Sequence, residues 1–177
     1  KDRGEQFISV KSEYFDINTH GNYNLPEFVG ALSNLVYNYL PVLSDEEFKP
    51  RETRPGEMEF EADFNNLSEI TTFFMPSLKI DKTIELKGRL DANRDHYIVN
   101  VKAPEIVYDT MKINDLQLDL LAGKESLGLN LNFDNIKNKG NNFLENFSVQ
   151  TNTINDSVQL NLSWDNEDSI RYSGNLN

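Results

Sequence analysis

Strict alternation of apolar and polar residues is the feature of this sequence that most restricts its fold. From Thr83 to Leu176 the chain is a succession of short segments in which apolar residues fall on every second position. A period of two places those side chains on one face of a pleated strand. The turns between the segments are rich in Asn, Asp and Gly, which accept left-handed backbone or bond their own backbone. The pattern predicts an antiparallel meander with one apolar face and one polar face.

The residues before Thr83 continue this pattern only in part. Alternation over 57–64 predicts a strand with an acidic outer face, and 7–11 and 14–17 predict two short extended segments. After the second of these segments, His20-Gly21-Asn22 predicts a turn of the chain toward Tyr23. The N-terminal part of the chain is therefore expected to add strands of its own.

Two helices are expected between these strands. An apolar stripe predicts an amphipathic helix over Leu25–Leu40, in which Asn24 and Glu27 resemble a capping box and Pro41 ends the helix. We interpret the stripe as packing on the sheet or plugging its open end, with a membrane-lying or partner-binding helix as the alternative. The absence of a basic face argues against the membrane. A second, shorter helix is predicted over Leu67–Met75.

Composition restricts the class of protein. With 177 residues and 38% hydrophobic content the chain can form a real core, and a net charge of −12 argues against nucleic-acid binding through a basic patch. No apolar run reaches the roughly 20 residues of a membrane helix, and no signal peptide or initiator Met begins the sequence, which suggests a piece of a longer protein. We predict short strands plus the amphipathic helix over 1–43, a linker over 44–56 and the antiparallel sheet over 57–177.

Residues suited to catalysis or metal binding are scarce. The chain has no Cys and only two histidines, His20 and His96. The segment Asp91–Asp95 begins like a calcium loop, but His96 stands where the loop needs Gly and Lys102 where a bidentate Glu belongs, so a hairpin turn is the better interpretation. The acidic residues over 57–63 could serve glycoside hydrolysis or calcium, yet such alternation is typical of a solvent face. We expect no enzyme, no cofactor and no metal site.

Several segments resemble the TamB family of translocation and assembly modules, most of all the long versions found in Bacteroidetes. The resemblance begins in 73–80, which leads into 83–88, and continues through the Ala-Pro-Glu-Ile-Val-Tyr strand within 99–108 to the strand 111–118. The earlier run over 15–41 fits the same family. The matching segments follow one another along the chain in the same order as in the family.

The resemblance implies an internal fragment of a large envelope protein of a Gram-negative bacterium. Its parent would be anchored elsewhere by one inner-membrane helix and would span the periplasm toward the outer membrane. TamB proteins are similar to AsmA-like and bridge-like lipid-transfer proteins, whose long sheets curl into a trough lined by apolar side chains. The implied partners are phospholipid acyl chains and an outer-membrane assembly protein of the BamA/TamA type, and the family has no catalytic residues to carry over.

The predicted fold class is therefore mainly β: an elongated, curved antiparallel sheet of the trough-like or β-taco type, with one amphipathic helix and a second short helix. In such a sheet the apolar residues at alternate strand positions would line a groove for lipid. The predicted groove lining is Leu86, Val99, Val101, Leu118, Leu129, Leu131, Leu160 and Leu162. The alternative is a structural or protein-binding β domain with a closed core, which binds protein through its edges. Edge-to-edge self-association of the fragment is a further expectation. Exposure of the apolar face distinguishes the two.

Overall fold

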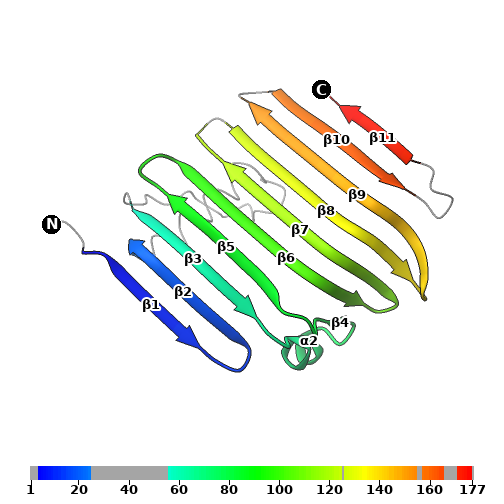
Figure 1. The fold of residues 1–177 in the computed structure, drawn as a ribbon, viewed down its shortest axis with the longest axis horizontal. Coiled ribbons are helices and arrows are strands. Elements are labelled where there is room, and N and C mark those ends of the chain that lie inside the picture. The colour runs from blue at the N-terminus through cyan, green and yellow to red at the C-terminus, as the bar shows by residue number, and fades with distance from the viewer. Residues whose placement is uncertain (1–3, 25–55, 125, 155–156, 166–170, 177) are drawn as a thin grey trace.

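The computed structural model of this chain is built on one antiparallel sheet (Figure 1). It describes residues 4–24, 56–124, 126–154, 157–165 and 171–176. The elements are β1 (Gln6–Lys11), β2 (Phe15–Asn22), β3 (Glu57–Phe64), α2 (Ser68–Phe74), β4 (Leu78–Lys79), β5 (Ile84–Asp91), β6 (His96–Tyr108), β7 (Met111–Ala122), β8 (Ser126–Asn138), β9 (Asn141–Ile154), β10 (Ser157–Asp165) and β11 (Arg171–Leu176).

Eleven strands form the sheet, and their order in space is β1-β2-β3-β5-β6-β7-β8-β9-β10-β11, with β4 paired to β6 outside this path. The prediction of a mainly β chain with antiparallel neighbours in sequence order is confirmed. The two N-terminal strands belong to the same sheet, because β2 pairs along its whole length with β3. The helix predicted over Leu25–Leu40, and the linker over 44–56 except for Gly56, lie outside the described residues.

One predicted turn near the N-terminus is wrong. His20, Gly21 and Asn22 continue β2, where they pair in register with the first residues of β3. Gly21 has a φ of +142°, and a side chain there would collide with the carbonyl oxygen of Glu57 on the neighbouring strand. The glycine therefore permits a close approach of two strands, which sequence cannot distinguish from a turn.

A longer connection joins β3 to β5, its neighbour in the sheet. Between them lie α2, which agrees with the predicted second helix, and the two-residue strand β4 beside the end of β6. The Ser68 hydroxyl accepts a hydrogen bond from the backbone N–H of Ile80 at 2.7 Å, which ties the start of α2 to the return segment. The Tyr14 hydroxyl donates to Glu69 at 2.8 Å. This hydrogen bond and the negative charge of Glu69 raise the pKa of Tyr14.

The longest strands, β6 to β9, turn back in tight hairpins, as the composition of the turns predicts. Tyr108 pairs with Met111 across the β6–β7 turn, whose Asp109 has left-handed backbone. The β8–β9 turn consists of Lys139 and Gly140, both with positive φ, which matches the twist of two-residue hairpins. These short connections keep each strand beside its sequence neighbour.

In β6 to β9 the apolar residues change from one set of alternate positions to the other. The change occurs at corresponding places in the four strands. In β7, for example, the alternation passes from Leu116 to Ile113. Asp115 lies between them with φ of +52°, and Asn146 at the corresponding place in β9 has φ of +48°. The register is unchanged across these places, so the apolar residues beyond them again lie opposite one another. They form one cross-strand row: Ile106, Ile113, Ile136 and Leu144.

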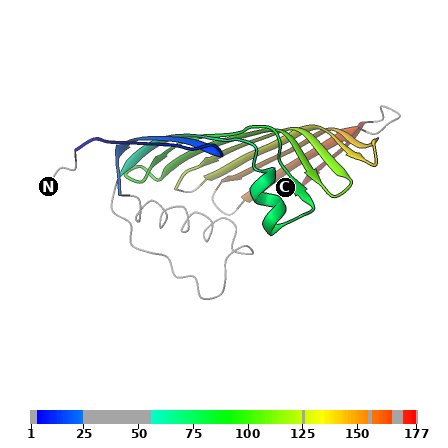
Figure 2. The same cartoon turned by 90° about the horizontal axis from the view of Figure 1, so that it is seen from below.

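Seen from the side, the sheet is arched and α2 lies on its hollow side (Figure 2). Among the described residues, no helix is long and apolar enough to cross a membrane. The described part of the chain is thus one curved layer of strands, with a single short helix attached near one end of the strands.

Candidate functional site

Two rows of mostly apolar side chains cross the sheet on one face, which we call the apolar face. Residues directly opposite each other on paired strands share a face, so the register traces each row from strand to strand. The first row is Val10, Ile17, Ala62, Leu86, Val101, Leu118, Leu131, Val149, Leu162 and Gly174. The second row is Ile8, Thr19, Phe60, Gly88, Val99, Leu120, Leu129, Thr151, Leu160 and Leu176.

All eight residues of the predicted groove lining lie in these rows. Leu118, for example, pairs with Val101 on one side and with Leu131 on the other. Sequence reasoning left out members of the same rows, including Val149 and Thr151, which separate the predicted lining of β8 from that of β10. Val149 carries the alternation that could have identified it, whereas only the register places Thr151.

The predicted lining is half-buried throughout. A third row on the same face is more deeply buried and includes Met58, Leu90, Ala122 and Leu127. Even so, among the described residues no large side chain is fully buried. This degree of burial agrees with a position on the hollow side of an arched single layer, where neighbouring side chains crowd one another without being sealed from solvent.

Aromatic residues border the two rows. Phe133 and Phe147 are cross-strand partners whose rings stack with centroids 4.5 Å apart. Trp164 and Tyr172 stack at 5.4 Å on β10 and β11. Near the other edge of the sheet, Tyr23 is buried and its hydroxyl forms a hydrogen bond with Thr19 of the second row. Each pair adds apolar area beside the rows.

The opposite face, which we call the polar face, is built from the alternate residues of the same strands. One of its rows is Ser9, Asn18, Glu61, Lys87, Asn100, Asp119, Asn130, Gln150, Asn161 and Asn175. Within this row the Asn100 amide donates to Asp119 at 2.6 Å. The row changes from charged residues on β3 and β5 to neutral amides on β8 to β11.

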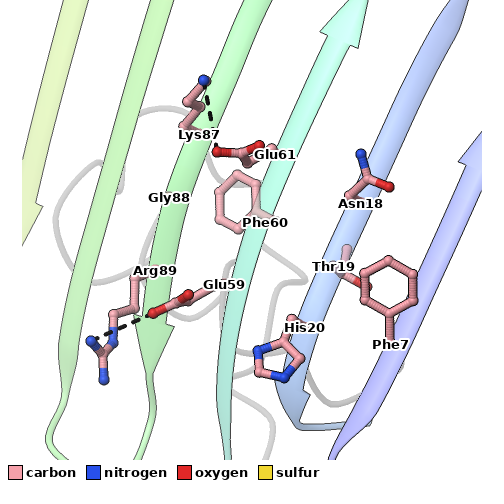
Figure 3. A pocket seen from close by; sticks show the side chains of 10 residues that line it. All are labelled: Phe7, Asn18, Thr19, His20, Glu59, Phe60, Glu61, Lys87, Gly88 and Arg89. Atoms are coloured by element: carbon pink, nitrogen blue, oxygen red, sulfur yellow. Dashed lines mark ion pairs between the residues drawn. The ribbon is translucent and has the colours of Figure 1, made fainter.

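A hollow of about 310 Å³ lies over β1, β2, β3 and β5 (Figure 3). Its carboxylates face cations: Glu59 lies 3.6 Å from the Arg89 guanidinium and Glu61 lies 3.7 Å from the Lys87 ammonium. Arg89 also pairs with Glu57. Glu57, Glu59 and Glu61 are thus matched by basic residues of β5, whereas Asp63 lies opposite Glu85. Exposed ion pairs of this kind are typical of a solvated face, and they contain no nucleophile–base pair.

The segment resembling a calcium loop forms the β5–β6 hairpin turn, as the sequence predicts. The Asp91 carboxylate is buried and accepts hydrogen bonds from the backbone N–H groups of Asn93 at 3.0 Å and Arg94 at 3.2 Å. Both hydrogen bonds go to Oδ1, and Oδ2 lies 3.5 Å from the Arg94 guanidinium, so the carboxylate is engaged by its own turn. Within the described ranges, no group of three or more His, Cys, Asp or Glu side chains could hold a metal ion.

Comparison of the chain with protein families, with curated proteins and with solved structures found no match. The resemblance to TamB proteins accordingly stays a hypothesis, and any function has to be argued from the apolar face itself.

Proposed function

We propose that the apolar face binds the acyl chains of phospholipids, and that the chain is a non-catalytic module for moving lipid along an apolar trough. The observation that supports the proposal is the continuity of the two rows, which extend across ten strands on one side of a single sheet. Nine inter-strand spacings of about 4.8 Å give a path of roughly 43 Å. Contiguous apolar surface on this scale is unusual for a monomer and indicates a ligand or an interface.

The energetics favour a chain-like apolar ligand. Each methylene that leaves water gains roughly 0.8 kcal/mol, so a few contacts per strand would hold an acyl chain without any contact to its headgroup. The rows offer no charged residue: where their members are not apolar they are Thr or Gly. Binding should therefore depend on the acyl chain and be broad in headgroup.

The cellular setting of this proposal comes from the resemblance alone. If the chain is part of a TamB-like protein, its site of action is the periplasm, its parent is anchored in the inner membrane, and lipid passes toward the outer membrane. Assembly of outer-membrane proteins with a partner of the BamA/TamA type would be the related activity.

The direct test is lipid analysis of the purified protein by native mass spectrometry. The parental chain should carry phospholipid, whereas Leu129→Asp with Leu131→Asp should lose it, because two charges then lie among the lining residues. The matched control is Asn130→Asp with Asn132→Asp, which puts the same two charges on the same strand but on the polar face, and which should retain lipid.

A second measurement covers the case in which the charged variant does not fold. A photo-crosslinking amino acid placed at Leu129 of the parental chain should label lipid, and the same group at Asn130 should not. Lipid retained at the parental level by a folded Leu129→Asp, Leu131→Asp variant, or equal labelling from both positions, would place lipid elsewhere.

The alternative is a structural or protein-binding β domain, and one observation favours it. At the end of α2, Phe73 and Phe74 are 81% and 79% exposed and Met75 is 49% exposed. The two rings pack edge to face at 5.0 Å. Exposed aromatic residues of this kind are common at protein interfaces. A parental protein that carries no lipid would make this alternative the better one.

A further inference from the structure

A second hollow, of about 590 Å³, lies over β6 to β10, strands that are side by side in the sheet (Figure 1). Most of the residues that line it alternate with members of the two apolar rows, so their side chains lie on the polar face. We call it the Gly128 hollow, after the residue between its two sides. Its volume is typical of sites for small ligands, which measure roughly 300–1,000 Å³.

A missing side chain opens this hollow. Gly128 pairs with Leu121 of β7 on one side and with Asn152 of β9 on the other. A side-chain carbon at Gly128 would have no atom closer than 3.8 Å, so no close contact between strands requires a glycine here. Glycine weakens the interior of a strand, and it often marks a place where a ligand approaches the backbone.

One side of the hollow is apolar, although it belongs to the polar face. Ile98 pairs with Leu121 across β6 and β7, and Leu121 is 50% exposed beside the gap at Gly128. An exposed leucine on a face built mainly from polar residues offers a small apolar surface to a ligand in the gap.

The other side of the hollow is made of amides. Asn152 pairs with Gln159, and Gln150 pairs with Asn161, across β9 and β10. All four side chains are exposed, and none of them forms a hydrogen bond with another described residue. Each amide has two N–H donors and a carbonyl acceptor, so this side can both donate to and accept from a ligand with hydroxyl groups.

The charge of the hollow restricts the ligand further. Among the described residues that line it, Asp119 is the one charged group, and it accepts a hydrogen bond from the Asn100 amide at 2.6 Å. No cation faces the hollow from these residues, and the chain as a whole has a net charge of −12. Phosphates and other anions would therefore be repelled, and a neutral ligand is favoured.

We propose that the Gly128 hollow binds a neutral oligosaccharide. A sugar ring has an apolar C–H face, which would pack on Leu121 and Ile98, and a rim of hydroxyl groups, which would exchange hydrogen bonds with the amides of β9 and β10. The place of Gly128 between the two sides would let the ring lie close to the sheet. The proposal concerns the polar face and does not depend on whether the apolar face binds lipid.

The first test is an NMR titration of the isotope-labelled parental chain with cellotetraose, a neutral oligosaccharide. The side-chain amide signals of Gln150, Asn152 and Gln159 should shift and reach saturation. The side-chain amide of Asn18, on the polar face of β2, should not shift. No saturable shift up to the solubility limit of cellotetraose, or equal shifts at Asn18, would overturn the proposal.

The second test fills the gap. Gly128→Val puts a side chain into the hollow, where the space is open, and should weaken cellotetraose binding by at least about ten-fold. Ser173→Val is the matched control, because it places the same residue at an exposed position of the polar face on β11, outside the hollow. It should bind cellotetraose like the parental chain. A folded Gly128→Val variant with parental affinity would overturn the proposal.

A charged probe tests the preference for a neutral ligand. An oligogalacturonate of the same length carries carboxylates and should bind the parental chain more weakly than cellotetraose, because Asp119 and the net negative charge repel it. Equal or tighter binding of the acidic oligosaccharide would contradict the assignment. This comparison and the NMR titration both use the parental chain, so they decide the matter even if Gly128→Val does not fold.

Discussion

The two faces of the sheet are made by the same strands but held by different interactions. On the apolar face the side chains contact their cross-strand neighbours, and the buried residues of the chain gather there, among them Leu90 and Ala122. On the polar face the interactions are ion pairs and amide hydrogen bonds between exposed groups, such as Arg89 with Glu59. In a single layer of strands, alternate side chains can therefore have different roles: those on one face pack and stabilise the fold, and those on the other face keep the surface polar.

The largest difference between the faces is expected at two adjacent residues of β8. Phe133 is buried and stacks on Phe147, so Phe133→Ala should lower the free energy of unfolding by about 3 kcal/mol. Asn132→Ala, on the polar face, should change it by less than about 0.5 kcal/mol. Urea unfolding monitored by circular dichroism measures both. Equal effects would show that the apolar face contributes no packing energy of its own.

A smaller difference is expected between two strand glycines. Gly88 lies on the apolar face opposite Phe60, and a side-chain carbon there would stand 2.5 Å from the ring and would collide with the Ile98 carbonyl oxygen. Gly88→Ala should therefore cost about 2 kcal/mol. Gly128 lies on the polar face with no atom closer than 3.8 Å, and Gly128→Ala should be neutral or slightly stabilising.

Thermal unfolding of both glycine variants measures this difference. If the Tm of Gly88→Ala equals that of the parental protein, the Phe60 ring does not pack over Gly88. In that case β3 and β5 are not tightly packed on the apolar face.

The smallest effect is expected on the polar face. Arg89→Gln removes the ion pairs to Glu57 and Glu59 and should lower the free energy of unfolding by no more than about 1 kcal/mol, because these charges are partly solvated. The effect should shrink in about 1 M salt, where screening acts within roughly 3 Å. Lys124→Gln, an exposed charge outside this cluster, is the control. A salt-independent loss would mean that Arg89 acts through packing.

Much of this fold could be predicted from the sequence because each strand is encoded by a local period. The alternation of Leu118 and Leu120 with their polar neighbours predicts both the strand and the face of each side chain, and the α2 helix follows from its own local pattern. The eight predicted lining residues lie on one face for the same reason. The face on which a side chain lies follows from its position within its own strand, so it can be predicted without knowing the neighbouring strands.

Register and the path between strands were decided by tertiary structure. The residues around Gly21 have the composition of a turn, but Gly21 belongs to a strand because β3 pairs with it. Thr151 enters the second row only through its partners on β8 and β10. Asp115, where the apolar alternation of β7 changes by one residue, has left-handed backbone, which the sequence does not show.

The sequence by itself thus determined where most of the strands lie and which of their side chains share the apolar face, since both depend on interactions within a few residues. Only the tertiary structure decided which residues lie opposite one another, and that the segment between β3 and β5 forms α2 and a short strand paired with β6. The physical reason is that backbone hydrogen bonds between strands join residues far apart in the chain, and the alternation that specifies a face is the same for every register shifted by two.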